Sequence, residues 1–244
     1  MAITITERVP LADPTDATSY VTGSFSPAAN SFLVAVYFTR HNTTAPAQTV
    51  SDSGGNTWNE DIPEQVDGIS TIGAWTCQLG ASPGSINVTF TNDGGVTAIG
   101  AGRSILEVSG HDPSGTVVAT YLAATGLTGT ASSGITMSAL GNANNAQIAW
   151  WIHRANESQS VEAGWTAGTS TGMNMTGPNM GCRTQWLIAG SDLTPGQTWT
   201  TSSRYQGLAL EIKAAAAGGG GYTGLWVPGM HRNHIGSMQT QGRA

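Results

Sequence analysis

Short stretches in which apolar and polar residues alternate run along most of the chain. Gly, Pro, Asn or Asp bounds each of them, which is typical of β-strands joined by turns. No segment keeps apolar residues at i, i+3, i+4 and i+7 over three turns, so helix is not expected. The alternating stretches are YVTGSF, SFLVAVYFTR, STIGAWTCQL, SINVTFT, RSILEVS, TVVATYLAA, SGITMSAL, AQIAWWIH, RTQWLIAG, QTWTTS and LALEIK. The pattern predicts an all-β protein, an antiparallel two-sheet β-sandwich of jelly-roll-like form.

The same order of features occurs twice along the chain. An apolar strand is followed by a Gly-Trp turn, a strand with Trp, a Pro-Gly turn and a closing strand with a central Glu. The first copy begins at NSFLVAVYFTRHN and the second at NAQIAWWIHRAN. Because nothing between residues 109 and 135 has the composition of a linker, we expect one β-sandwich domain, residues 1–213, with two pseudo-repeated halves.

The C-terminal end changes character after Lys213. Residues 214–221, AAAAGGGG, are expected to form a flexible linker. Residues 222–244 then carry too many apolar groups for a solvated tail and too few to fold alone, so we expect a docking arm that binds a neighbouring subunit. Packing of the arm onto its own sandwich is the alternative. The expected docking residues are Tyr222, Leu225, Trp226, Val227, Pro228, Met230 and Ile235, with His231, Arg232 and His234 as a polar rim.

Charge excludes some functions. Only 10% of residues are charged, the net charge is −6, and the one Lys and eight Arg form no basic run, so nucleic acid is not an expected partner. The start, MAITITERVP, lacks the features of a signal peptide, and no apolar run is long enough to cross a membrane. We therefore expect synthesis in the cytoplasm, where Cys77 and Cys182 would be buried thiols rather than a disulfide.

Three acidic or histidine-containing segments are candidate metal sites. VSDSGGNTWNE lacks the spacing of a calcium or phosphate loop and is expected to be a hairpin turn, with Gly54 and Gly55 at positive φ. The acidic run Glu60, Asp61, Glu64 and Asp67 is expected to be a solvated loop, with a calcium site as the alternative. The His231/His234 pair has no third ligand nearby. No metal and no cofactor are therefore expected.

Glu107 and Glu211 occupy the centres of matching strands, so a glycoside hydrolase was considered. Jelly-roll hydrolases carry two acids close together on one strand, whereas SILEVSG and LALEIK carry one each. The strand alternation places each Glu on the face opposite its apolar neighbours, and we expect both on a polar face without a catalytic role. No enzymatic activity is predicted.

The chain also has eight tryptophans. Most fall within expected strands and should fill the core. Trp58 and Trp165 lie in matching turns and are the one pair expected to be exposed. Stacking of sugars on this pair makes a carbohydrate-binding adhesion module, with surface glycans as its partner, the alternative function.

Four stretches together resemble a β-sandwich module that is common in tailed-phage virion proteins and also found in bacterial surface proteins. They are SPAANSFLVAVYF, VSDSGGNTWNE, GRSILEVSG and YQGLALEIK. The resemblance covers residues 20–213 and consists of a strand rhythm and a D-x-x-G-N-T-W turn, so it carries no site residues. It implies a non-enzymatic protein at the virion surface, assembled in the host cytoplasm. The expected roles are an outer capsid decoration or cement subunit, or a head or tail appendage, forming a homo-oligomer and binding capsid or other virion subunits.

Overall fold

In a computed structural model, the described residues are 2–10, 15–114, 117–122, 129–132, 135–173 and 179–216. They form sixteen strands and one short 3-10 helix, Asp93–Gly95, and every strand pair is antiparallel. The prediction of an all-β protein built from packed antiparallel sheets is confirmed, but the described residues form four sheets rather than the two that were expected. No helix in this part of the chain is long and apolar enough to span a membrane.

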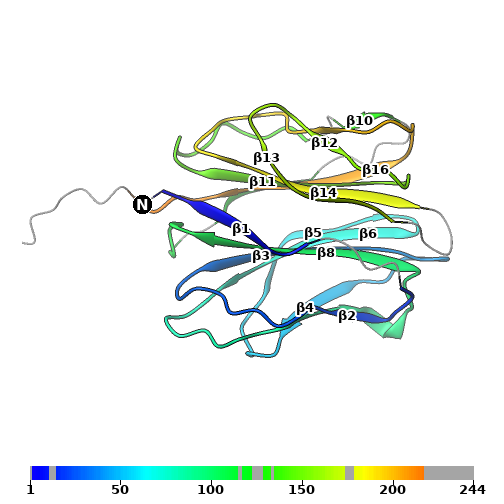
Figure 1. Ribbon diagram of the computed structural model, residues 1–244, viewed down its shortest axis with the longest axis horizontal. Helices are drawn as coiled ribbons and strands as arrows, with labels where there is room; N and C mark the ends of the chain where they lie inside the picture. The colour runs from blue at the N-terminus through cyan, green and yellow to red at the C-terminus, as the bar shows by residue number, and fades with distance from the viewer. Residues whose placement is uncertain are drawn as a thin grey trace, which may run out of the picture.

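The first half of the chain forms two sheets (Figure 1). The first inner sheet has the strand order β1-β8-β3-β6-β5, and the first outer sheet has the order β2-β7-β4. The strands are β1 (Thr4–Val9), β2 (Ser19–Val21), β3 (Phe32–Arg40), β4 (Gln48–Asp52), β5 (Asn59–Asp67), β6 (Ser70–Gln78), β7 (Val88–Asn92) and β8 (Gly100–Ser109).

The second half repeats this arrangement. The second inner sheet has the order β9-β16-β11-β14-β13, and the second outer sheet has the order β10-β15-β12. Each strand therefore occupies the place of the strand eight positions earlier in the chain. The strands are β9 (Val117–Leu122), β10 (Ala131–Ser132), β11 (Ala146–His153), β12 (Ser160–Val161), β13 (Thr166–Met173), β14 (Met180–Ile188), β15 (Gln197–Thr198) and β16 (Tyr205–Ile212).

The four sheets stack as layers, with the two inner sheets facing each other (Figure 1). Three apolar clusters fill the three gaps between the layers. In β3, Val34 and Val36 face the central cluster between the inner sheets, whereas Leu33 and Ala35 face the first outer sheet. Burial on both faces explains why β3 and β11 read as nearly continuous apolar runs in the sequence.

The inner sheets face each other with their strand orders reversed. At one edge, the Glu7 carboxylate of β1 accepts hydrogen bonds from the backbone N–H and the hydroxyl of Thr169 in β13. At the other edge, β5 contacts β9. A pseudo-two-fold axis parallel to the strands produces this arrangement, so the two halves pack like the subunits of an isologous dimer.

Both ends of the described chain lie at one pole of the molecule. Ala214 forms a bridge with His111, and the Ala215 N–H donates to the carbonyl of Gly110 at 3.1 Å. Gly110 also lies against Ala2, whose carbonyl a Cβ at this position would overlap. The linker was expected to start at residue 214, but Ala214 is buried and Ala215 is hydrogen-bonded to the body.

Candidate functional site

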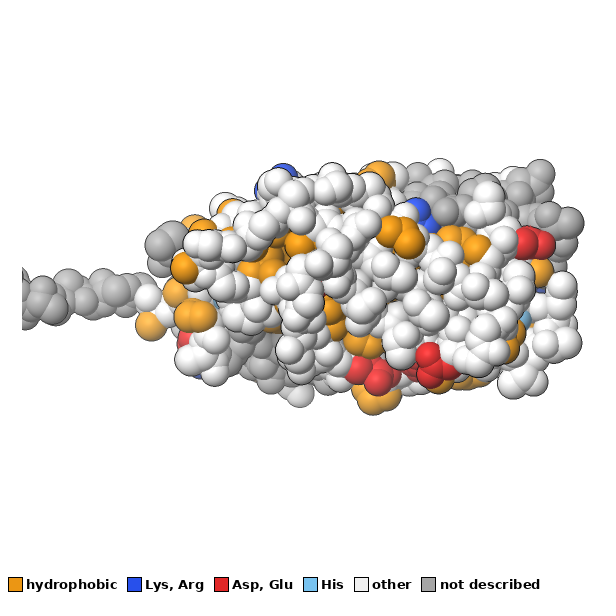
Figure 2. Space-filling view, turned by 90° about the horizontal axis from the view of Figure 1, so that it is seen from below, with side chains coloured by type: hydrophobic (Ala, Val, Ile, Leu, Met, Phe, Trp, Pro, Cys, Tyr) orange, Lys and Arg blue, Asp and Glu red, His pale blue; other side chains and the backbone are white. Residues whose placement is uncertain are grey.

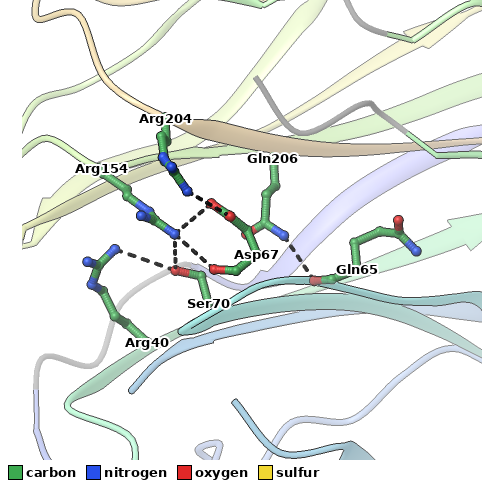
Figure 3. A network of polar contacts seen from close by, with 7 residues as sticks. All are labelled: Arg40, Gln65, Asp67, Ser70, Arg154, Arg204 and Gln206. Carbon is green, nitrogen blue, oxygen red and sulfur yellow. Dashed lines mark hydrogen bonds and ion pairs between the residues drawn. The ribbon is translucent and has the colours of Figure 1, made fainter. Parts of the chain in front are cut away.

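A cluster of three arginines lies at the opposite pole, on the seam between the two halves (Figure 3). Arg40 ends β3, Arg154 directly follows β11, and Arg204 directly precedes β16. Asp67 and Ser70 flank the short turn between β5 and β6. Packing of β3 over β11 brings these residues together from positions far apart in the sequence.

Asp67 joins the first half to the second. The Arg154 Nη2 donates to its carboxylate at 2.6 Å and to its backbone carbonyl at 3.0 Å. The Arg204 Nη1 donates to the other carboxylate oxygen at 3.0 Å. Gln206 adds a bond from its side-chain amide to the carbonyl of Gln65, at 2.9 Å. All of these bonds cross the seam, so they hold the inner sheets in register at this pole.

Arg40 is the most deeply buried member, with 4% of its surface exposed. Its Nη1 donates to the Ser70 hydroxyl at 3.4 Å, and its Nε is buried without a hydrogen-bond partner. Burial, followed by repulsion from Arg154, lowers the pKa of Arg40 to about 10. The guanidinium therefore remains protonated at neutral pH.

A small hollow opens beside Arg154 and Arg204, whereas Arg40 does not line it. Its lining is formed by Asp67, Ser70, Ile152, His153, Arg154, Met180, Arg204, Tyr205 and Gln206. The His153 ring stacks on Trp199 with 4.9 Å between centroids. Burial lowers the pKa of His153 to about 4, so the ring is neutral at neutral pH. The hollow thus presents positive charge and hydrogen-bond donors, which suit an anion.

These arginines were not predicted from the sequence. A signal was present in it, since TRHN follows the first apolar strand and HRAN the second. The docking residues that were predicted, all within residues 222–235, lie outside the described residues.

Glu107 and Glu211 are buried, contrary to the expectation of a polar face. The Glu107 carboxylate accepts from the backbone N–H of Ala28 at 2.7 Å, and Glu211 accepts from the N–H of Gly141 at 3.0 Å. The alternation was predicted correctly, but loops cover the face on which both acids lie. The two acids occupy corresponding positions in the two halves. Each accepts a hydrogen bond from the loop that precedes the central strand of its half.

The acidic run is not a loop. Residues 59–67 form edge strand β5, which has two irregularities of register, and the second of them, between Ile62 and Gln65, accommodates Pro63. Its carboxylates have separate partners: Glu60 accepts from the N–H of Glu64, Asp61 from a β6 threonine, and Glu64 from the N–H at the start of β4. Among the described residues, no group of three or more His, Cys, Asp or Glu could hold a metal ion.

The two tryptophans expected to be exposed form no exposed pair. Trp165 is buried and its indole N–H donates to Asp192 at 2.9 Å. Trp58 is half-buried and donates to Asp52 at 2.7 Å. Because each indole N–H reaches a carboxylate, the rings pack against the body without losing a hydrogen bond.

The Asp52 turn is not the hairpin turn that was expected, because it joins β4 of the first outer sheet to β5 of the first inner sheet. The side chain of Asp52 holds this turn. The carboxylate accepts from the backbone N–H groups of Gly54 and Asn56, at 2.7 and 3.2 Å. Gly55 has a positive φ of 71°, whereas Gly54, expected to share this conformation, does not. Cys77 and Cys182 are buried and form no disulfide, as predicted.

Comparison with known proteins gives no family assignment. No family model matches the chain, and no match was found among curated proteins or solved structures. The function proposed below therefore rests on the residues and geometry of this chain.

Proposed function

We propose that the protein is a non-enzymatic structural subunit displayed on the surface of a bacteriophage virion. Its role is that of an outer capsid decoration or cement subunit, or of a head or tail appendage. Residues 222–244 anchor it to a neighbouring virion subunit, and it acts as a homo-oligomer.

The observation that carries the proposal is the position of the chain ends. Ala2 and Ala215 both contact Gly110, so the chain enters and leaves the body at one pole. In the sequence, a Gly-rich spacer comes after the last residues at this pole, and the apolar C-terminal residues come after the spacer. Attachment through such an arm would leave the rest of a long, layered body free to project from a particle.

The body has features that suit an exposed structural role. Its outer face in the first half shows few charged groups, with hydrophobic groups scattered among backbone and uncharged side chains (Figure 2). The two acids considered as catalytic are hydrogen-bonded to loop backbones, so they stabilise the fold. Four stacked sheets with three apolar clusters give a body that resists deformation.

The test compares incorporation of variants into particles produced from a genome that encodes this chain. The full chain is compared with a chain ending at Ala216, which keeps the hydrogen bonds of Ala214 and Ala215. We expect the full chain in purified particles and the shortened chain, although folded by thermal melting, to be lost from them. Trp226→Ala should give most of the same loss.

Gln239→Ala, a polar change in the same arm, is the matched control and should incorporate normally. Sedimentation velocity of the purified proteins reports the oligomeric state in parallel. Normal incorporation of the shortened chain would refute the anchoring role. Absence of the full chain from the particles would refute the virion assignment itself.

A further inference from the structure

The two halves match each other closely at the arginine seam. Glu107 lies opposite Leu33 and Glu211 lies opposite Gln147 in the strand pairing. Arg40 follows Leu33 by the same number of residues as Arg154 follows Gln147. The repeat has therefore placed one arginine from each half at the same pole, on either side of the pseudo-two-fold axis.

The negative charge that faces these arginines is present in the first half alone of the two matching connections. The connection from β5 to β6 carries Asp67, whereas the corresponding connection from β13 to β14, residues 174–179, reads NMTGPN and contains no acid. The second half adds a further cation, Arg204, at the start of β16. In the described part of the chain, two guanidinium groups, those of Arg154 and Arg204, donate to the Asp67 carboxylate, and the third, that of Arg40, donates to the Ser70 hydroxyl. Three positive charges thus face one negative charge at the seam.

The excess charge is costly where it is buried. A charged group out of water needs both an opposite charge and full hydrogen bonding. The side chain of Arg40 has one hydrogen bond, to Ser70, and its buried Nε has none. Arg154 donates to the same hydroxyl at 3.5 Å, so the two guanidinium groups approach one another around a single neutral oxygen.

The size of the hollow limits what can supply the missing charge. Its empty space is about 180 Å³ with the open mouth included, and the enclosed part has room for little more than one water-sized particle. A phosphate ester or a nucleotide would not fit without displacement of the lining. We propose that the seam binds one small monovalent anion, with chloride as the abundant one, in this hollow beside the Ser70 hydroxyl and the guanidinium groups of Arg154 and Arg204. Arg40 does not line the hollow but donates to the same Ser70 hydroxyl, so its charge acts on the anion from behind that side chain.

Chloride and an anion too large for the hollow can be compared in solution. Thermal melting of the full chain is followed in sodium chloride and in sodium gluconate at constant ionic strength, so general screening is equal. We expect chloride to raise the melting temperature saturably, by about 2–4 °C relative to gluconate. Bromide should act like chloride. Equal melting temperatures in chloride and gluconate at all concentrations would overturn the proposal.

Variants locate the effect. Arg40→Met and Arg204→Met should each weaken chloride binding. The chloride concentration that gives half of the stabilisation should rise at least tenfold in each variant. Arg204 is partly exposed, so its replacement keeps the proposal testable if loss of the buried Arg40 prevents folding. Arg8→Met is the control, because it removes a cation bonded to Glu107 in the outer part of the first half and should leave the chloride dependence unchanged.

Crystals grown in sodium bromide give a direct readout. An anomalous peak beside Ser70, within contact of Arg154 and Arg204, would support the site. A chloride effect that survives in both seam variants, or bromide peaks elsewhere with none at Ser70, would contradict it.

Discussion

Arg154 of the second half donates two hydrogen bonds to Asp67 of the first, one to the carboxylate and one to the backbone carbonyl. Only 13% of the Asp67 side chain and 21% of the Arg154 side chain are exposed. Little solvent therefore screens the pair, and it connects two halves that share no hydrogen-bonded sheet. Its strength should be visible in the stability of the whole molecule.

Asp67→Asn should lower the free energy of unfolding by about 1–3 kcal/mol, because it leaves the Arg154 charge partly buried without a counter-charge. Urea denaturation followed by tryptophan fluorescence measures the change. The control is Asp16→Asn, at an exposed aspartate of the same half, which should leave stability unchanged. Equal stabilities of the two variants would show that the pair contributes nothing across the seam.

Glu211→Ala should also destabilise the protein, by about 1–3 kcal/mol, because it leaves the N–H of Gly141 and the side-chain amide of Asn145 without their acceptor. Asn145 in turn accepts from the N–H of Ala214 at 2.9 Å. Hydrogen exchange at Ala214 should therefore become faster. Glu211→Gln keeps an acceptor oxygen and should lose less stability. Unchanged exchange at Ala214 in the Ala variant would disprove the link.

Glu162 should make the protein less stable as the pH rises. Burial, then the hydrogen bond and repulsion from Asp192, raises its pKa to about 7. The folded chain thus holds a proton that the unfolded chain releases near pH 4.5, so this contribution to stability is present below about pH 4.5 and is lost as the pH rises to about 7. Denaturation between pH 4 and 8 should show a flatter profile for Glu162→Gln, while Asp16→Asn keeps the wild-type slope.

His153 should act in the opposite direction. Burial lowers its pKa to about 4, against about 6.5 for the unfolded chain. The neutral ring is favoured in the fold, so this contribution is present above about pH 6.5 and is lost as the pH falls to about 4. His153→Gln cannot take up the proton and should remove the loss on acidification, whatever its effect at pH 7. An unchanged acid limb in this variant would rule out His153 as the cause.

Gly102→Ala should destabilise the central core by about 1–3 kcal/mol. The ring of Phe38 covers Gly102 on the neighbouring strand, and a Cβ there would overlap it. Gly84→Ala is the control, because a Cβ at Gly84 would meet nothing within 4 Å. If both substitutions have the same effect on urea denaturation, packing of Phe38 on Gly102 is not the cause.

Local pattern was enough to predict most strands of the inner sheets. β3, β6 and β11 lie within the alternating stretches, and β8, β14 and β16 each overlap one of them and begin a few residues before it. Local pattern was not enough to predict the strands at the edges of the sheets. Residues 59–67 carry Pro63 and four acids, which is typical of a loop, but an edge strand tolerates both because one side of it needs no partner. β4 and β12 are short and polar and gave no pattern to detect.

The arginine seam depends on packing that no local pattern reports. Asp67 and Arg204 are separated by most of the second half of the chain, and they meet only because the inner sheets face each other. Burial of Trp165 depends likewise on Asp192 from a later connection. What the sequence did show was the repeat itself, which places Arg40 and Arg154 in matching positions.

Isologous packing of the two inner sheets also affects synthesis of the chain. The first half is complete before any strand of the second inner sheet has been made, so its apolar inner face, with Val34, Val36 and Leu106, lacks its cover. At about 5–20 residues per second, translation of the roughly 100 residues from the end of β8 to the end of β16 takes about 5–20 s. During that time, a nascent first half on a neighbouring ribosome presents the same self-complementary face. The covalent connection favours the correct partner, because a tethered second half competes at an effective concentration of about millimolar.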